Sequence, residues 1–357
     1  MSLKKKIAID ISYYWKLSWY WIVTNNLLKN ILEKDKKNYF YLISNENKNL
    51  SEIKHLKNWE FICTNTSFVL HKFFKLTKYL KKYWIDLYFS FDQDIPLKKV
   101  CKYAIVCHDI WAYIYWKKDT LINLLKKKIS LLVWIYYLLG IDKKSAKKSD
   151  LIFCPSQNTK NDLIKYYWID KNKIIVSYWW LDHLKTNSTW KINDYILFPF
   201  SNLYDDFQYE LANKLIEEKI INKIVFLKPA CLNNDNILKN GIKIIRNRIS
   251  ESELANYYSN AKLSIYLTSY DGFWFPPLES IFYWTPVLCN NAPCIPEILD
   301  WLWIIGELNE NNFIATIKKY LNDKKSYESL LVKQKNRIKI FNRNNTATII
   351  LDNLWKC

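Results

Sequence analysis

The sequence is poor in glycine, in arginine and in long apolar runs. Only 4 of its 357 residues are glycine, far below the usual proportion of about 7%, so few turns can use the residue that tolerates positive φ. No run reaches the length of roughly 18 apolar residues expected of a transmembrane helix. The apolar stretch 7–11 is too short for a signal peptide. The sequence also has no CxxC pair, so nothing in it suggests a zinc site. We therefore expect a metal-free protein with reduced thiols, either free in the cytoplasm or peripheral at the inner membrane face.

Lysine dominates the charge. The formal net charge is +19, and the only arginines are Arg246, Arg248, Arg337 and Arg343. Such a surface attracts anions, whether nucleotides, acidic lipids or nucleic acid. No recognised nucleic-acid-binding motif accompanies the charge, so a basic nucleic-acid binder is the weakest of these readings and we expect no nucleic-acid partner.

Tryptophan is as abundant as glycine is scarce, with 17 copies. Many copies stand in turn-like contexts where glycine is usual: Trp19, Trp21, Trp179, Trp180, Trp274, Trp284, Trp301 and Trp303. Tryptophan cannot replace glycine where φ is positive or where the backbone approaches a phosphate closely. Our hypothesis is that UGA codons are read here as tryptophan although the source lineage reads them as glycine. The alternative is a genuinely tryptophan-rich surface.

Short apolar runs alternate with helical patterns, and the alternation restarts near residue 195. The expected strands are Lys6–Ile11, Tyr39–Ile43, Glu60–Thr64, Leu87–Phe91, Tyr103–Cys107, Leu151–Cys154, Ile174–Tyr178, Tyr195–Phe200, Lys223–Leu227, Ile242–Ile245, Leu263–Leu267 and Val287–Asn290. The alternation predicts an α/β protein with two Rossmann-like, doubly wound parallel sheets. We expect domains at 1–184 and 185–340, with a helix at 341–357 that packs back on the first domain.

The most informative stretch is Thr268–Ser280, because a strand, a glycine-containing loop and a helix start follow one another there. Pro277 suits a first helical turn, and a helix start offers N–H groups and a positive dipole end to a diphosphate. The two acids Asp271 and Glu279 lie on either side of that start. The pattern predicts a phosphate-bearing ligand in this loop.

This stretch resembles the signature E-G-F-G-[LF]-P-x-x-E of retaining glycosyltransferase family 4, and with glycine at 274 it reads D-G-F-G-F-P-P-L-E. Further segments agree with the family in order and spacing: Ser18–Trp21, Ser149–Ser156, Tyr178–Asp182, Arg246–Leu254, Trp284–Val287 and Pro296–Glu297. The resemblance covers nearly the whole chain. It implies a GT-B fold with two facing Rossmann-like domains.

The resemblance also implies an activity: transfer of a hexose, in the manner of a mannosyltransferase, from a GDP- or UDP-linked sugar to a glycan or lipid-linked acceptor in polysaccharide biosynthesis. The nucleotide-sugar is then a substrate and no cofactor is needed. Asp271 and His108 are the implied catalytic residues beside the sugar. The implied donor-binding residues are Glu279 at the ribose, the backbone at Trp19, Trp21, Gly272, Phe273 and Trp274, Arg248 and Ile249 near the base, and Lys228.

Three features keep other readings open. The family usually has a basic pair after the first strand of its second domain, whereas Phe198–Asp206 contains no base; an inactive nucleotide-sugar or glycan-binding protein is therefore the alternative function. Asp92-Gln93-Asp94 looks like a metal-binding DxD motif, but we interpret it as a polar loop.

The lysines around 117–128 could dock on an anionic membrane, or they could be the solvated side chains of a core helix. A nucleotide-sugar epimerase shares the fold, and the 271–279 pattern argues against it.

Overall fold

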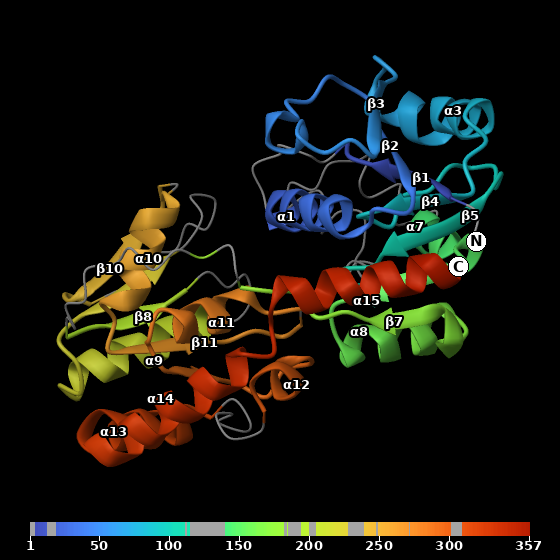
Figure 1. Cartoon of the computed structure of the whole chain (residues 1–357). Coiled ribbons are helices and arrows are strands. Elements are labelled where there is room, and N and C mark those ends of the chain that lie inside the picture. Colours follow the sequence, from blue (N-terminus) through green and yellow to red (C-terminus); the bar gives the residue numbers. More distant parts are fainter. Residues whose placement is uncertain are drawn as a thin grey trace. The chain divides into compact units, whose positions relative to one another are not determined.

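The computed structural model describes residues 4–12, 19–110, 113–114, 140–181, 184, 194–199, 205–227, 239–247, 249–270, 272–300 and 309–357. The chain divides into two compact units (Figure 1). Unit 1 comprises residues 1–180 and 342–357, and unit 2 comprises residues 181–341. Each unit is built on its own sheet, so each is described separately.

The sheet of unit 1 has seven parallel strands in the order β3-β2-β1-β4-β5-β6-β7. Their bounds are β1 Lys6–Asp10, β2 Tyr39–Ser44, β3 Trp59–Cys63, β4 Leu87–Ser90, β5 Lys102–Val106, β6 Leu151–Cys154 and β7 Ile174–Val176. The chain starts in the middle of the sheet and then extends it outward in both directions, so the strand order reverses between β1 and β4. Ligands of such sheets bind beyond the carboxyl ends of the strands at this reversal.

The helices of unit 1 are α1 Trp19–Lys34, α2 Phe68–Leu70, the π-helical η2 His71–Lys75, α3 Leu76–Lys82, α7 Ile141–Lys148, α8 Gln157–Asp162, the π-helical η3 Leu163–Tyr167 and α15 Arg343–Lys356, with short 3₁₀ turns η1 Ser51–Ile53 and η4 Lys171–Lys173. The continuous helical segment 68–82 was not anticipated from the sequence. Among the helices that the structure describes, none is long and apolar enough to cross a membrane.

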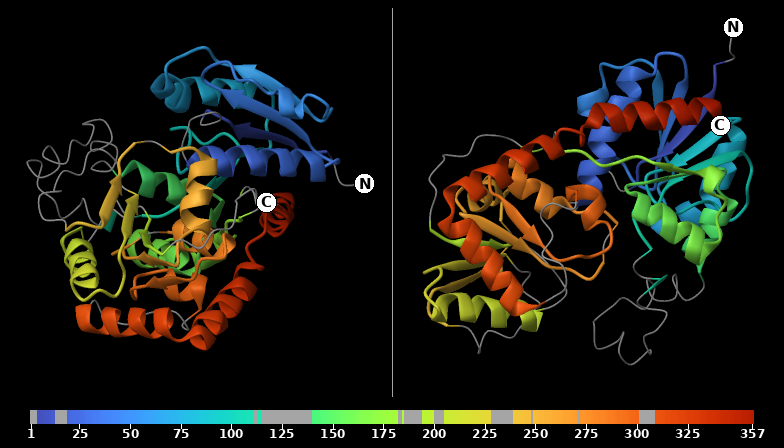
Figure 2. Two further views of the ribbon diagram at one scale, coloured as in Figure 1. Left: turned by 90° about the vertical axis from the view of Figure 1, so that its left-hand side faces the viewer. Right: turned by 90° about the horizontal axis from the view of Figure 1, so that it is seen from below.

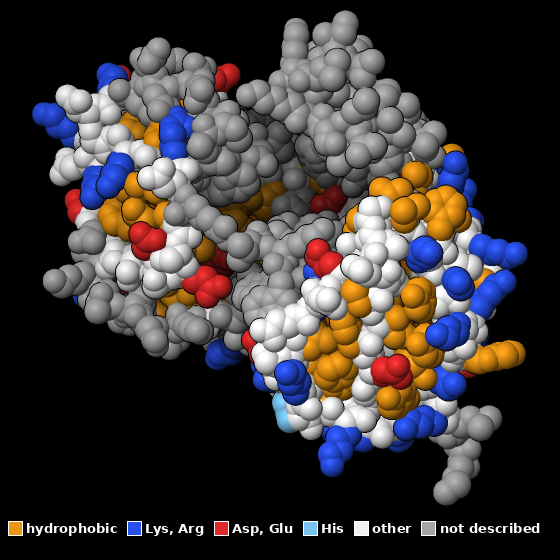
Figure 3. Space-filling view, turned by 90° about the horizontal axis from the view of Figure 1, so that it is seen from above, with side chains coloured by type: hydrophobic (Ala, Val, Ile, Leu, Met, Phe, Trp, Pro, Cys, Tyr) orange, Lys and Arg blue, Asp and Glu red, His pale blue; other side chains and the backbone are white. Residues whose placement is uncertain are grey.

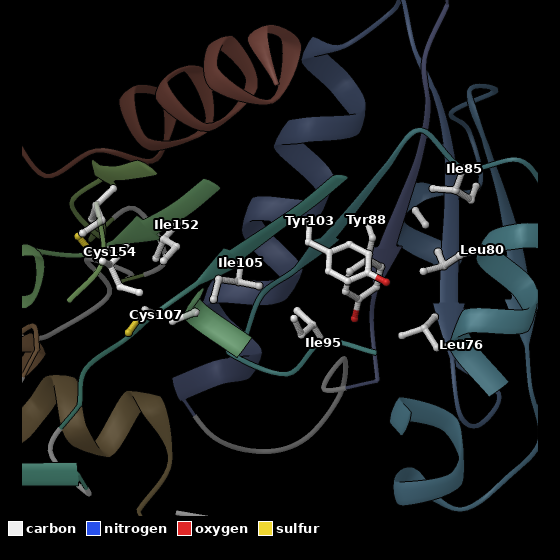
Figure 4. Close-up of a cluster of buried hydrophobic side chains, with 14 of the residues drawn as sticks. Leu76, Leu80, Ile85, Tyr88, Ile95, Tyr103, Ile105, Cys107, Ile152 and Cys154 are labelled. Carbon is white, nitrogen blue, oxygen red and sulfur yellow. The ribbon is translucent and has the colours of Figure 1, made fainter. Parts of the chain in front are cut away.

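One core of unit 1 lies between its sheet and the helices on one face (Figure 4). Leu76 and Leu80 of α3 meet Tyr88 of β4, and Tyr103 of β5 continues the layer. The rings of Tyr88 and Tyr103 pack edge to face, with centroids 5.6 Å apart. Because strands of a parallel sheet are covered on both faces, their sequences read as continuous apolar runs.

The C-terminal helix α15 belongs to unit 1, although the whole of unit 2 precedes it in the chain. It packs along α1, as Figures 1 and 2 show. The Trp355 indole Nε1 donates a hydrogen bond to the buried Asp35 carboxylate at 2.9 Å. Lys5 Nζ donates to the Trp355 carbonyl, also at 2.9 Å. These contacts fasten the end of the chain to the first sheet and its helix α1.

The sheet of unit 2 has five parallel strands in the order β10-β9-β8-β11-β12. They are β8 Ile196–Phe198, β9 Ile224–Leu227, β10 Ile242–Ile245, β11 Leu263–Tyr266 and β12 Val287–Cys289. The helices are α9 Asp205–Glu217, α10 Glu251–Ser259, α11 Phe275–Phe282, α12 Ile295–Leu299, α13 Glu310–Asn322 and α14 Lys324–Ile338. The strand order reverses between β8 and β11. The prediction of two doubly wound, Rossmann-like α/β domains is confirmed.

Three helical segments of the described chain end at a tryptophan in the left-handed conformation. Trp84 after α3, Trp168 after η3 and Trp284 after α11 have φ values of 55°, 55° and 65°. Glycine is the usual residue at such helix ends, because it has no Cβ to clash. Trp274, by contrast, has φ −101°, so its backbone does not itself require glycine, contrary to the expectation from the sequence.

Candidate functional site

The loop that follows β11 lies where the strand order of unit 2 reverses. Two hydrogen bonds fix its second residue: Thr268 N–H donates to the Asn290 side-chain oxygen at 2.9 Å, and Asn290 Nδ2 donates to the Thr268 carbonyl at 2.8 Å. Both residues are buried. Asn290 directly follows β12, so a side chain from the neighbouring strand holds this loop in place.

The loop leads into α11, which begins earlier than the sequence suggested. The helix starts at Phe275 and includes Pro276 in its first turn, whereas the sequence predicted a start near Pro277. Glu279 consequently lies beyond the first turn. Among the described side chains none caps this helix start. Its positive dipole end therefore faces the loop at the carboxyl edge of the sheet, an arrangement that favours an anion.

Glu279 is the one acid of the paired-acid motif that the structure describes. Its carboxylate accepts a hydrogen bond from the Tyr258 hydroxyl at 3.0 Å. Burial raises the pKa of Glu279 to about 7, and the bond from Tyr258 partly opposes that rise. The carboxyl therefore changes charge near neutral pH, which is uncommon for a glutamate and is often seen at functional sites. Sequence reasoning missed Tyr258, whose ring stacks on Tyr283 with centroids 6.0 Å apart.

Hydrophobic packing fixes the end of the loop, directly before α11. Trp274 is buried, its ring meets Tyr266 edge to face at 4.9 Å, and its indole N–H donates to the Pro293 carbonyl at 3.2 Å. The buried Phe273 ring packs against Phe275 at 5.4 Å. In this structure the Trp274 indole is thus accommodated in the interior of unit 2.

A second loop of unit 2 joins β10 to α10, as the sequence predicted. Ser250 is the N-cap residue of α10: its hydroxyl accepts from Glu253 N–H, and the Glu253 carboxylate accepts from Ser250 N–H at 2.7 Å. This capping box satisfies two N–H groups at the helix start. Ile249, the residue before the cap, is partly exposed. The cap therefore fixes the backbone from Ser250 into α10.

In unit 1, His108 follows β5 and is buried. Its Nε2 lies 2.8 Å from the Phe91 carbonyl, and because a carbonyl can only accept, Nε2 carries the proton. Burial lowers the pKa of His108 to about 4, although this hydrogen bond works in the opposite direction. The imidazole is therefore neutral at pH 7. It packs against the Trp179 ring with centroids 5.4 Å apart.

A buried ionic cluster that sequence reasoning missed lies at the end of β1. Asp10 forms an ion pair with Lys72 Nζ at 2.8 Å and accepts a hydrogen bond from the Tyr88 hydroxyl at 3.0 Å. Burial alone would raise the pKa of Asp10, but Lys72 and His71 hold it well below its ordinary value. Asp10 also accepts from the Ser12 N–H at 2.8 Å. A strand-end acid within the apolar run 7–11 was the only sequence signal for this cluster.

The Asp92-Gln93-Asp94 loop borders that cluster. The Asp94 carboxylate lies 3.9 Å from Lys72 Nζ. Among the described residues, no three or more His, Cys, Asp or Glu side chains are grouped so that they could hold a metal ion.

Comparison with known proteins gives a match at the level of structure. No protein-family model matches the sequence, and no curated protein matches it significantly. WaaG, described as a glycosyltransferase involved in lipopolysaccharide biosynthesis, superposes with a TM-score of 0.68 at 12% identity, covering 97% of this chain and 98% of that one. Sucrose-phosphate synthase from Thermosynechococcus elongatus gives 0.65 at 12% identity, covering 99% and 98%. The chain has the GT-B fold.

A third solved structure of this fold was determined with ligands. HepE from Anabaena, in complex with UDP and glucose, has a TM-score of 0.64 at 12% identity, covering 99% of this chain and 100% of that one. One GT-B fold supports several chemistries, so the activity of this chain must be argued from its own residues.

The structure of this chain describes only part of the predicted site. It brings Glu279, Gly272, Phe273 and Trp274 together around the start of α11, with Ile249 before α10, and it places His108 in unit 1. Asp271, Arg248 and Lys228 lie outside the described residues, and so do the side chains of Trp19 and Trp21. The assignments of all these residues to a donor site remain predictions.

Proposed function

We propose that the chain is a glycosyltransferase that moves a hexose from a nucleotide-sugar to a glycan or lipid-linked acceptor with retention at the anomeric carbon. The observation that carries the proposal is the position of the D-G-F-x-F-P-P-L-E stretch. It spans the loop after β11 and the start of α11, where the strand order of unit 2 reverses. A family signature and the expected ligand position of the fold therefore coincide.

The chemistry of this loop suits a nucleoside diphosphate. The dipole of α11 favours the negative diphosphate at its N-terminal end. The carboxylate of Glu279, one turn further on, can accept hydrogen bonds from the two ribose hydroxyls when it is ionised. Tyr258 already donates to one of its oxygens, which orients the carboxylate. We assign the base of the donor to the turn at Arg248 and Ile249, and the diphosphate additionally to the backbone at Trp19 and Trp21.

The sugar end of the donor is assigned to Asp271 and His108. The low pKa of His108 means that it would act as a neutral, hydrogen-bonding side chain and not as a cation. The proposed donor carries UDP or GDP, and the proposed sugar is a hexose such as mannose, used in polysaccharide synthesis. No cofactor is required, because the leaving nucleotide provides the driving force.

A catalytically impaired nucleotide-sugar or glycan-binding protein is the second candidate. It is favoured by the absence of lysine and arginine from the sequence 198–206, since a leaving diphosphate must be stabilised by positive charge or N–H donors. Lys228 is the proposed substitute. The two candidates differ in turnover but not in donor binding.

We also propose that glycine occupies many of the tryptophan positions in the natural protein, because UGA is read as glycine in the source lineage. The support is that Trp84, Trp168 and Trp284 all have positive φ at helix ends and exposed side chains. Trp180 adds a buried indole N–H for which the described chain offers no acceptor, a costly arrangement. Sequencing the gene tests this directly, and UGG codons at most of these positions would sink it.

The activity is tested with protein that carries glycine at the UGA-encoded positions. It is incubated with UDP- and GDP-linked hexoses, and released nucleotide is measured against a Glu279→Gln variant. The proposal predicts release from at least one donor, with Glu279→Gln reduced about tenfold or more through a weaker ribose contact. Donor binding without release would favour the second candidate. Neither binding nor release across the panel would refute the transferase and the nucleotide-sugar-binding form of the second candidate.

The proposed location is the cytoplasm, with peripheral contact to the inner membrane face where a lipid-linked acceptor is used. The lysines near 117–128 that suggested such contact lie outside the described residues.

A further inference from the structure

The helical segment 68–82 of unit 1 has an unusual charge and exposure pattern. Residues 61–85 include five lysines and no acidic residue. The segment presents its own outward surface, which we call the 69–82 surface and define by Val69, Leu70, Phe74, Lys75, Lys78, Lys81 and Lys82. All seven of these side chains are exposed. The surface therefore combines apolar and basic side chains without any acid among them.

The inner face of the same segment is tightly held. Lys72 is 1% exposed and pairs with Asp10, and His71 is 0% exposed and lies 2.8 Å from the Thr64 hydroxyl. Leu76 and Leu80 point into the core (Figure 4). Because four inward side chains fix the helix, the outward ones are displayed by a rigid element and not by a mobile loop.

The outward face begins apolar and becomes basic. Val69, Leu70 and Phe74 are 52%, 48% and 60% exposed at the start of the segment. Lys78 follows Phe74 by four positions, so it lies on the same face of the helix. Large apolar side chains clustered in water are costly unless they meet a partner. In Figure 3, lysine side chains border exposed hydrophobic ones over the part of unit 1 that is seen from above.

We propose that the 69–82 surface docks on an anionic lipid bilayer. An apolar edge that can enter the headgroup boundary, followed by lysines that can meet acidic headgroups, is the composition of interfacial helices. Each lysine near an anionic leaflet adds to the attraction, and the effect requires no acid nearby to compete. The total absence of acids over 61–85 thus favours a uniformly negative partner over a protein surface of mixed charge. The inference holds whether or not the chain transfers sugar.

The experiment measures co-sedimentation of the full-length protein with vesicles, without any donor or acceptor. Vesicles of phosphatidylcholine alone are compared with vesicles containing about 30% phosphatidylglycerol, at two salt concentrations. One variant reverses the charge of the four lysines, Lys75→Glu/Lys78→Glu/Lys81→Glu/Lys82→Glu. A second removes the apolar edge, Val69→Ser/Leu70→Ser/Phe74→Ser. A matched charge control alters four exposed lysines of unit 2: Lys324→Glu/Lys325→Glu/Lys333→Glu/Lys339→Glu. Far-UV circular dichroism confirms that each variant is folded.

We expect binding only to the anionic vesicles, weakened by salt. The charge variant should lose affinity by about tenfold or more and the apolar variant by about threefold or more, while the unit 2 control stays within about twofold. Failure of the unaltered protein to bind anionic vesicles would overturn the proposal. Equal losses in the charge variant and its control would also overturn it, because net charge alone would then explain binding. An unaffected apolar variant would point to a polyanion such as nucleic acid and reject lipid docking.

Discussion

Trp84 offers a sharp test of the claim that helix ends of this chain are built for glycine. It follows α3 with φ 55°, and its side chain is 81% exposed. We compare two substitutions at this position, Trp84→Gly and Trp84→Ala. Both remove the same exposed indole, but only glycine also removes the Cβ that clashes in the left-handed conformation.

The expected difference follows from two opposing effects. A residue with a Cβ pays about 1–2 kcal/mol in the left-handed region. The glycine variant avoids this cost, but it loses about 0.4–1 kcal/mol of folding free energy because glycine makes the unfolded chain more flexible. Trp84→Gly should therefore be more stable than Trp84→Ala by about 0.5–1 kcal/mol. The surrounding contacts hardly enter the comparison, since the indole is mostly in water.

Urea unfolding followed by circular dichroism measures this difference. Trp355→Gly is the contrasting variant, since Trp355 lies inside α15 and its indole binds Asp35; it should lose about 1–2 kcal/mol through glycine in a helix and a lost hydrogen bond. If Trp84→Ala is as stable as Trp84→Gly, the backbone at residue 84 is not left-handed and the structural support for glycine there fails.

Three further predictions concern charge. The folded pKa of Glu279, about 7, lies above its usual value, so the neutral acid is favoured below pH 7. If the carboxylate binds the ribose as proposed, the affinity for a nucleotide-sugar should rise up to about tenfold between pH 6 and 8, and Glu279→Gln should flatten that profile in calorimetric titrations. The folded pKa of His108, about 4, lies below its usual 6.5, so the stability that it contributes is complete above pH 6.5 and about 3 kcal/mol is lost as pH falls to 4; His108→Asn should remove that slope in urea unfolding, and an unchanged slope would contradict the assigned burial. Lys72→Met leaves Asp10 buried without its cation and should cost about 3–5 kcal/mol, whereas adding Asp10→Asn should recover part of the loss in a double-mutant cycle; purely additive losses would mean that the pair is not coupled.

The strands could be predicted because the burial of each strand is visible in its own short stretch of sequence. Strands buried on both faces read as short apolar runs, and all twelve runs expected from the sequence are strands, with ends that differ by at most two residues. Leu151–Cys154 and Ile242–Ile245 match the expectation at both ends. The order of the strands within each sheet was not predicted from the sequence and comes from the structure.

The helical segment 68–82 was missed because its inward face is not apolar throughout. His71 and Lys72 point inward and are paired with Thr64 and Asp10. A lysine in a lysine-rich run reads as solvated, and only the tertiary structure shows that this one is desolvated and partnered. Phe74 points outward, although an apolar residue is expected to point into the core. A periodic pattern of apolar residues would therefore assign the wrong face of this helix to the interior.

The candidate site was predictable as a motif but not as a geometry. The sequence correctly indicated a strand, a loop and a helix around Gly272, yet the helix begins at Phe275 because proline is accepted within a first turn and does not have to open it. The partners Tyr258 and Asn290 come from a different helix and a different strand end. No spacing rule along the chain connects such residues to Glu279 or Thr268.

The central claim is that a nucleotide-sugar binds at the carboxyl edge of the unit 2 sheet, against the start of α11. Hydrogen exchange of the backbone amides, measured with and without a saturating donor, tests it most directly. The account predicts slower exchange at residues 268–282 and 249–259, and weaker protection of both segments in Glu279→Gln at the same donor concentration. A bound or hydrolysed donor that leaves the exchange of both segments unchanged would contradict it.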